Sequence, residues 1–120
     1  MEIKIMKNIL GANQDKADEV RTLLAQKKVL MLNCIGSPGC GKTSLLEKTI
    51  DHFQGIYTIA VIEGDVASDR DAQRIGAHGV PIVLINTDGA CHLESISIEN
   101  ALAEFDLDTT DIVFVENVGN

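Results

Sequence analysis

The stretch Gly36-Ser37-Pro38-Gly39-Cys40-Gly41-Lys42-Thr43 determines how the rest of this sequence is interpreted. It fits the pattern G-x-x-x-x-G-K-[ST]. It follows the apolar run 29–35 and precedes a segment, 44–53, whose apolar residues fall at helical spacing. Strand, glycine-rich turn and helix is the order that a phosphate-binding loop requires. An ordinary glycine-rich turn is the alternative, and it does not explain why the motif and both flanks agree.

Each residue type in this loop suits a nucleoside triphosphate. Gly36, Gly39 and Gly41 let the backbone approach a ligand closely, so that main-chain N–H groups can converge on phosphate oxygens at the positive end of a helix dipole. Lys42 would place its ammonium between the β- and γ-phosphates, and the Thr43 hydroxyl would ligate Mg²⁺. The sequence therefore predicts nucleotide binding.

The composition limits the class of protein. At 120 residues the chain is at most one domain, and its apolar residues are mostly aliphatic with only 3% aromatics, which suits a parallel sheet covered by helices. The formal net charge of −8 and the lack of a basic patch argue against nucleic-acid binding. Three scattered cysteines predict reduced thiols in a cytoplasmic protein. No apolar run is long enough for a signal peptide core or a membrane span.

Apolar periodicity and turn residues predict alternating strands and helices, hence an α/β fold with a parallel sheet and right-handed crossovers. The segment 1–10 is left open between a strand and a helical arm. The expected helices are 13–28, 44–53, 68–76 and 93–105. The expected strands are 29–35, 57–62, 82–85 and 111–116.

Acidic residues follow two of the predicted strands, at the sheet edge where open α/β proteins bind ligands. Asp65 and Glu116 are therefore candidates for the Mg²⁺ shell beside Thr43. A helix cap or a hydrogen-bonding loop residue remains the alternative for each acid. Phosphoryl transfer depends on neutralising charge, so we assign the catalytic role to Lys42 and Asp65.

Cys91 and His92 form a second candidate site, because thiolate and imidazole together suit Zn²⁺ or Ni²⁺. Two adjacent residues cannot complete a four-ligand site, but a symmetric dimer would supply a second pair. The alternative is a buried thiol beside a helix-capping histidine.

Four segments, taken in order, resemble the hydrogenase nickel incorporation GTPase HypB family. They are Gly-Ser-Pro-Gly-Cys-Gly-Lys-Thr-Ser-Leu-Leu-Glu at 36–47, Val-Ile-Glu-Gly-Asp-Val-Ala-Ser-Asp-Arg-Asp-Ala at 61–72, Gly-Ala-Cys-His-Leu at 89–93 and Val-Glu-Asn-Val-Gly-Asn at 115–120. The resemblance covers almost all of the chain past Val29. It implies a P-loop G domain of the dimerising branch of GTPases.

The resemblance also implies a function and a set of site residues. The function is a Mg²⁺-dependent GTPase that dimerises with nucleotide and helps to load nickel into [NiFe]-hydrogenase, possibly also urease, with HypA and the hydrogenase large subunit as partners. Thr43, Asp65 and Glu116 fall on the Mg²⁺ positions, and Cys91 and His92 on ligands for Ni²⁺ or Zn²⁺. The phosphate-binding residues are Gly36, Ser37, Pro38, Gly39, Cys40, Gly41, Lys42, Thr43 and Ser44.

The sequence departs from the family pattern after residue 120. The family continues into a further metal-binding cysteine and an Asn-Lys-x-Asp guanine-reading motif, so we expect residues 1–120 to be a single G domain that is incomplete at its C-terminal end. Its helix 13–28 would precede a core beginning at 29. A nucleotide- and metal-binding module without effective turnover is the alternative function. A small nucleotide kinase fits less well, because no arginine-rich lid is present.

Overall fold

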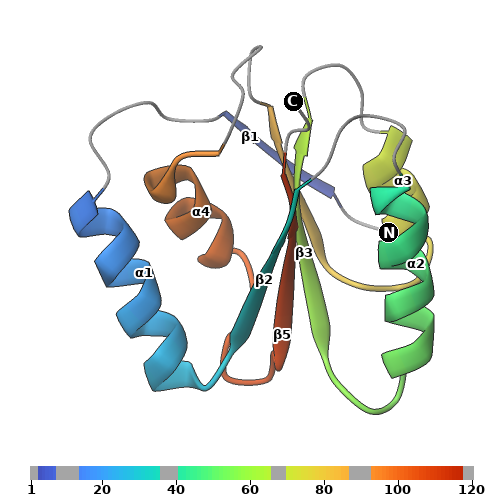
Figure 1. The fold of residues 1–120 in the computed structure, drawn as a ribbon, viewed down its shortest axis with the longest axis horizontal. Coiled ribbons are helices and arrows are strands. Elements are labelled where there is room, and N and C mark those ends of the chain that lie inside the picture. Colours follow the sequence, from blue (N-terminus) through green and yellow to red (C-terminus); the bar gives the residue numbers. More distant parts are fainter. Residues whose placement is uncertain (1–2, 8–13, 36–40, 66–69, 87–92, 118–120) are drawn as a thin grey trace.

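A five-stranded parallel sheet forms the centre of the computed structural model, in which residues 3–7, 14–35, 41–65, 70–86 and 93–117 are described (Figure 1). The strands lie in the order β1-β4-β3-β5-β2, and every neighbouring pair is parallel. Their bounds are β1 (Ile3–Lys7), β2 (Leu30–Cys34), β3 (Ile59–Asp65), β4 (Ile82–Asn86) and β5 (Ile112–Glu116). All strands therefore end at the same edge of the sheet.

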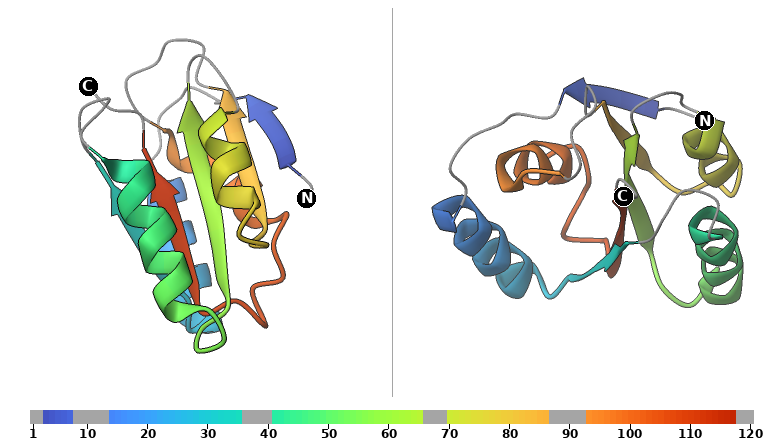
Figure 2. Two further views of the ribbon diagram at one scale, coloured as in Figure 1. Left: turned by 90° about the vertical axis from the view of Figure 1, so that its right-hand side faces the viewer. Right: turned by 45° about the horizontal axis from the view of Figure 1, so that its top comes forward.

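Two pairs of helices cover the two faces of the sheet (Figure 1, Figure 2). Their bounds are α1 (Gln14–Lys27), α2 (Lys42–Phe53), α3 (Arg70–Gly76) and α4 (Ser95–Leu102). On one face α1 packs against α4, and on the other α2 packs against α3. None of the helices in the described ranges is long and apolar enough to cross a bilayer.

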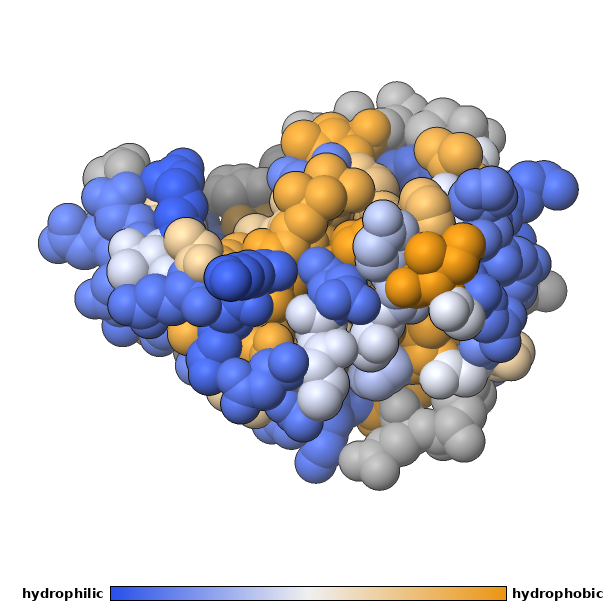
Figure 3. Space-filling view, turned by 90° about the horizontal axis from the view of Figure 1, so that it is seen from below, coloured by the Kyte–Doolittle hydropathy of each residue, from blue (hydrophilic) through white to orange (hydrophobic). Residues whose placement is uncertain are grey.

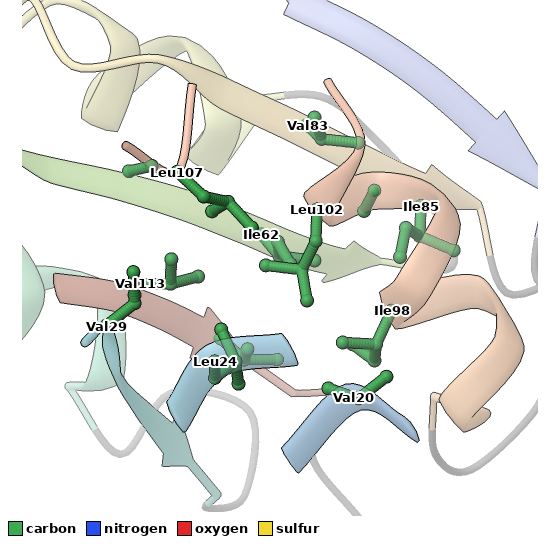
Figure 4. Close-up of a cluster of buried hydrophobic side chains, with 13 residues drawn as sticks. Val20, Leu24, Val29, Ile62, Val83, Ile85, Ile98, Leu102, Leu107 and Val113 are labelled. Atoms are coloured by element: carbon green, nitrogen blue, oxygen red, sulfur yellow. The ribbon is translucent and has the colours of Figure 1, made fainter. Parts of the chain in front are cut away.

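The larger hydrophobic cluster lies between the sheet and the helices α1 and α4 (Figure 4). Val20 and Leu24 of α1 meet Ile98 and Leu102 of α4 there, because these pairs recur at four-residue spacing and so share one helix face. The strands contribute Ile62, Ile85 and Val113, among others. A second cluster joins α2 and α3 to the opposite face of the sheet through Leu46, Ile50, Ala72, Ile75, Val61, Leu84 and Phe114.

The predicted elements are confirmed with shifts of a few residues at their ends. The segment left open at the N-terminus contains a strand, β1, at one edge of the sheet. The helix predicted over 93–105 is shorter, because the chain after Leu102 turns, with the Phe105 N–H bonded to the Leu102 carbonyl. The predicted helix start at Ser68 lies outside the described residues.

The predicted bounds of the second strand were wrong at both ends, and the difference changes where two acids of the site lie. We expected it over 57–62 with the acids following it, whereas β3 starts at Ile59 and continues to Asp65. It does so because Glu63, Gly64 and Asp65 pair in register with Leu84, Ile85 and Asn86 of β4. These acids therefore belong to a central strand, with their backbone fixed by its neighbours.

Strand β2, which leads into the glycine-rich loop, lies at the other edge of the sheet. Its Leu30 and Leu32 side chains are 54% and 41% exposed. Viewed from below Figure 1, apolar residues also reach the surface in the middle of the molecule, between hydrophilic flanks (Figure 3). The described part of the chain thus leaves apolar groups in contact with solvent at one sheet edge.

Gly64 gives Leu93 room to pack against the end of β3. A Cβ atom at position 64 would lie 3.0 to 3.1 Å from three side-chain carbon atoms of Leu93. The φ angle of Gly64 is not positive, so the backbone conformation does not require glycine at this position. The side chain of Leu93 requires it, because it leaves no room for a Cβ atom. Leu93 in turn packs against the larger hydrophobic cluster.

We expect Gly64→Ala to lower the free energy of unfolding by about 1–3 kcal/mol, because overpacking forces a buried neighbour to move. Denaturant unfolding measures this loss. The double variant Gly64→Ala/Leu93→Ala should recover part of it by restoring space. If the double variant instead loses as much free energy of unfolding as the two single variants together, the contact with Leu93 is not what excludes a larger residue at position 64.

A cluster of charges joins α2 to α3 on the outer side of the sheet. The His78 ring nitrogens Nδ1 and Nε2 lie 2.7 Å from Asp51 Oδ1 and 3.0 Å from Glu47 Oε2. Arg74 of α3 also donates to Glu47. The hydrogen bond to Glu47, followed by the nearby Asp51, raises the pKa of His78 above its usual value. The same bond lowers the pKa of Glu47.

These pKa shifts predict a pH-dependent contribution to stability. Because the folded-state pKa of His78 is raised, its stabilisation is complete below the ordinary histidine pKa and is lost as the pH rises through the raised value. At about pH 6, where Glu47 is still ionised, His78→Asn should lower the free energy of unfolding by about 0.5–1 kcal/mol.

The difference between wild type and His78→Asn should shrink towards about pH 9, where histidine is neutral. Urea unfolding at both pH values measures it, with His52→Asn at the exposed end of α2 as the matched control. If His78→Asn lowers the free energy of unfolding equally at both pH values, stabilisation by a protonated His78 is contradicted.

Candidate nucleotide and cation site

The first turn of α2 is arranged to receive an anion. Gly41, the residue before the helix, has φ 97° and ψ 16°, a left-handed conformation that glycine adopts without steric cost. Among the residues that the structure describes, no side chain caps this helix end by a hydrogen bond. The N–H groups of the first turn are therefore available at the positive end of the helix dipole, as phosphate binding requires. Of the predicted phosphate-binding residues, Gly41, Lys42, Thr43 and Ser44 are described, and residues 36–40 lie outside the described ranges.

Thr43 joins the start of α2 to the end of β5. Its hydroxyl donates a hydrogen bond of 2.7 Å to Glu116 Oε1, and both residues are buried, at 8% and 4% exposed. The other carboxylate oxygen, Glu116 Oε2, is buried and accepts no hydrogen bond from the residues that the structure describes. A buried carboxylate oxygen without a donor is costly, so this oxygen is available to a cation.

Lys42 lies in the same corner of the molecule. Its Nζ donates a hydrogen bond of 3.1 Å to the carbonyl oxygen of Asn117, the residue after β5. Asn117 is held in place by its backbone N–H, which bonds to the Cys34 carbonyl at 2.9 Å, and by its amide, which donates to Asn33 Oδ1 at 3.1 Å. Phosphate oxygens form stronger hydrogen bonds with an ammonium group than a neutral carbonyl does, so they can replace this contact.

Glu63 is a residue of this site that the sequence analysis did not identify. It lies directly opposite Glu116 in the register of β3 and β5 and is only 2% exposed. Alternation along β3 places Glu63 on the same face as Val61, which belongs to the α2 and α3 cluster. The signal that could have revealed it is an acid two residues before Asp65, inside an otherwise apolar strand.

Cys34 ends β2 on the same side of the sheet, next to Glu116 in register. Partial burial, followed by the nearby Glu116 carboxylate, raises the pKa of the Cys34 thiol above its usual value. A thiol held in its protonated form is a poor nucleophile and a poor metal ligand. Cys34 therefore acts as a packing residue at the edge of the second hydrophobic cluster.

The remaining predicted site residues stay predictions. Asp65 is the last residue of β3, at the edge where the site lies, but its side chain is outside the described part of the structure. Cys91 and His92 also lie outside it, directly before Leu93. Within the described ranges, no three His, Cys, Asp or Glu side chains form a group that could hold a metal ion.

Comparison with curated proteins finds relatives that match nearly the whole chain. A probable hydrogenase maturation factor HypB from Methanocaldococcus jannaschii is 43% identical over 118 residues, which are 98% of this chain and 53% of the relative. A hydrogenase/urease maturation factor HypB from Helicobacter hepaticus is 45% identical over 122 residues, covering 98% of this chain and 50% of the relative. The chain thus spans about half the length of these relatives.

Solved structures agree with this fold. HypB from Helicobacter pylori in complex with nickel superimposes with a TM-score of 0.80 at 38% identity, covering 90% of this chain and 51% of that one. HypB from Archaeoglobus fulgidus gives a TM-score of 0.80 at 34% identity, with 90% and 52% covered.

The family described as CobW/HypB/UreG, nucleotide-binding domain, matches residues 30–120, from β2 to the last residue. The match includes the glycine-rich loop, Lys42, Thr43 and both buried acids. The chain belongs to the CobW/HypB/UreG nucleotide-binding domain family.

Proposed function

We propose that this chain binds GTP with Mg²⁺ and hydrolyses it, as the G domain of a HypB-type factor that delivers nickel during hydrogenase maturation. The observation that carries the nucleotide part is the buried hydrogen bond between Thr43 and Glu116 at the first turn of α2. The names of the relatives, which are hydrogenase maturation factors, support the biological role, and the match to a nucleotide-binding domain family supports the binding of a nucleotide.

The donor set around Thr43 fits Mg²⁺. A hydroxyl and carboxylate oxygens are the hard ligands that this ion prefers, and Glu116 Oε2 is a buried oxygen without a donor among the described residues. Thr43 and Glu116 would hold the ion, and we keep Asp65 as a further ligand. When bound, Mg²⁺ offsets the negative charge that develops on phosphate oxygens during transfer.

Each residue of this site then has a defined role in GTP binding or hydrolysis. The N–H groups after Gly41 bind phosphate oxygens, and Lys42 leaves the Asn117 carbonyl to pair with them. Glu116 accepts a hydrogen bond from the Thr43 hydroxyl, which leaves the lone pairs of that oxygen for the cation. We assign Asp65 to the magnesium and switch region, since it ends β3 at this sheet edge.

The metal site and the partners are part of the same proposal. Cys91 and His92 would bind Ni²⁺ or Zn²⁺ where two copies of the chain meet, because two adjacent ligands cannot fill a four-coordinate shell. Nucleotide binding would favour this homodimer. HypA and the hydrogenase large subunit are the expected partners in the cytoplasm, and the solved complex of a related HypB with nickel supports this metal.

Lys42→Ala tests the nucleotide site. Hydrogen bonds to charged groups contribute about 1.5–3 kcal/mol, so the affinity for a GTP analogue with Mg²⁺ should fall by roughly 10- to 100-fold in calorimetric titration. Lys48→Ala on the exposed side of α2 is the matched control and should bind normally. Equal affinities for Lys42→Ala and the control would remove the phosphate-loop assignment.

The double variant Cys91→Ala/His92→Ala tests the metal site. It should bind less Ni²⁺ or Zn²⁺ per chain in equilibrium dialysis while its circular dichroism stays unchanged, because the ligands are lost but the core is not. Cys34→Ala, which alters a packing thiol instead, should keep the metal. Equal metal content in the wild type and the double variant would exclude Cys91 and His92 as ligands.

A further inference from the structure

Two buried carboxylates lie side by side on neighbouring strands. Glu63 of β3 is the register partner of Glu116 of β5, and the two residues are 2% and 4% exposed. Adjacent strands in a sheet are about 4.8 Å apart, and side chains at paired positions of a parallel ladder point to the same face. The two acids therefore lie buried on the same face of the sheet, where Glu116 contacts Thr43 of α2.

Such an arrangement is unfavourable without a positive charge. Like charges repel strongly in a medium of low polarity, and removing a carboxylate from water is itself costly. The Thr43 hydroxyl relieves only one oxygen of Glu116, and Glu116 Oε2 accepts no hydrogen bond from the described residues. A divalent cation bound at these acids would offset their charge.

Glu63 is buried in a central strand of the sheet. Strand β3 is hydrogen-bonded to β4 on one side and β5 on the other, so its backbone is fixed up to Asp65. The next residue, Gly64, is covered on the opposite face by Leu93 at a distance that leaves no space for a Cβ. Glu63 therefore stays buried on the face of the sheet that also carries Glu116.

We propose that Glu63 is a further carboxylate of the divalent cation site, which it forms together with Glu116 and the Thr43 hydroxyl. The inference rests on the proposed function, which assigns Mg²⁺ to this corner but gives Glu63 no part in it. Among the residues that the structure describes, two acids and a hydroxyl would be its protein ligands. Phosphate oxygens and water complete the shell, as Mg²⁺ usually requires.

A purely structural role of Glu63 and a role in cation binding predict opposite effects of the same substitution. If Glu63 only supports the fold through a hydrogen bond of its own, replacing it by the neutral isostere Gln costs stability and leaves the cation affinity unchanged. If Glu63 serves the cation, Glu63→Gln removes repulsion from the metal-free protein and weakens cation binding. The stability of the metal-free protein and its cation affinity, measured for Glu63→Gln, therefore distinguish a structural role from a role in cation binding.

The experiment compares the wild type with Glu63→Gln, Glu116→Gln and Glu104→Gln in two measurements. One is the melting temperature in EDTA and in Mg²⁺, and the other is the affinity for Mn²⁺, read by electron paramagnetic resonance with a non-hydrolysable GTP analogue present. Glu104 is exposed and lies after α4, so its variant controls for the loss of one negative charge.

We expect Glu63→Gln to melt at the wild-type temperature or higher in EDTA, to gain less from Mg²⁺, and to bind Mn²⁺ about 10-fold more weakly or worse. Glu104→Gln should behave as the wild type. Should Glu63→Gln fail to fold, Glu63→Asp keeps the charge but withdraws it by one methylene, and its Mn²⁺ affinity should fall by about 3-fold or more.

Two different results would overturn two different claims. Unchanged Mn²⁺ affinity in Glu63→Gln, or in Glu63→Asp if only that variant folds, overturns the role of Glu63 while Glu116→Gln still supports the proposed site. No Mn²⁺ binding in the wild type itself contradicts the proposed function, whatever the variants do.

Discussion

The hydrogen bond from the Thr43 hydroxyl to Glu116 is the contact on which the site depends. It fixes the first turn of α2 against the carboxyl end of β5, and it does so in a buried place where both groups must be satisfied. Lys42 and the first N–H groups of α2 are placed by the same turn. The anion-binding and cation-binding halves of the site are thus one local structure.

The parallel sheet brings residues that are distant in sequence to this turn. Residues 34, 63 and 116 end up side by side because β2, β5 and β3 are neighbours in register. The rigid setting comes from the two clusters on the faces of the sheet, and the charged cluster around His78 adds a link between α2 and α3. A site of this kind needs a stiff frame, since carboxylates held at fixed separation bind a cation without first being ordered.

Much of this arrangement could be predicted from the sequence, and the misses have physical reasons. Apolar runs bounded by turn residues predicted the α/β fold, and the glycine-rich loop predicted Lys42 and Thr43. Glu63 was missed because an acid within a strand is recognised only when its cross-strand neighbour is known, and pairing between residues 63 and 116 is not a local property. The order of the strands, with β2 at an edge, is likewise set by long-range packing.

The most direct measurement is a crystal structure with a non-hydrolysable GTP analogue and Mn²⁺, in which anomalous scattering locates the ion. The account predicts one peak at about 2–2.5 Å from Thr43 Oγ1, on the side of Glu116, with the phosphates at the first turn of α2. Nucleotide bound at this turn with no ion next to Thr43 would contradict the role given to the buried acids, and nucleotide bound elsewhere would contradict the site as a whole.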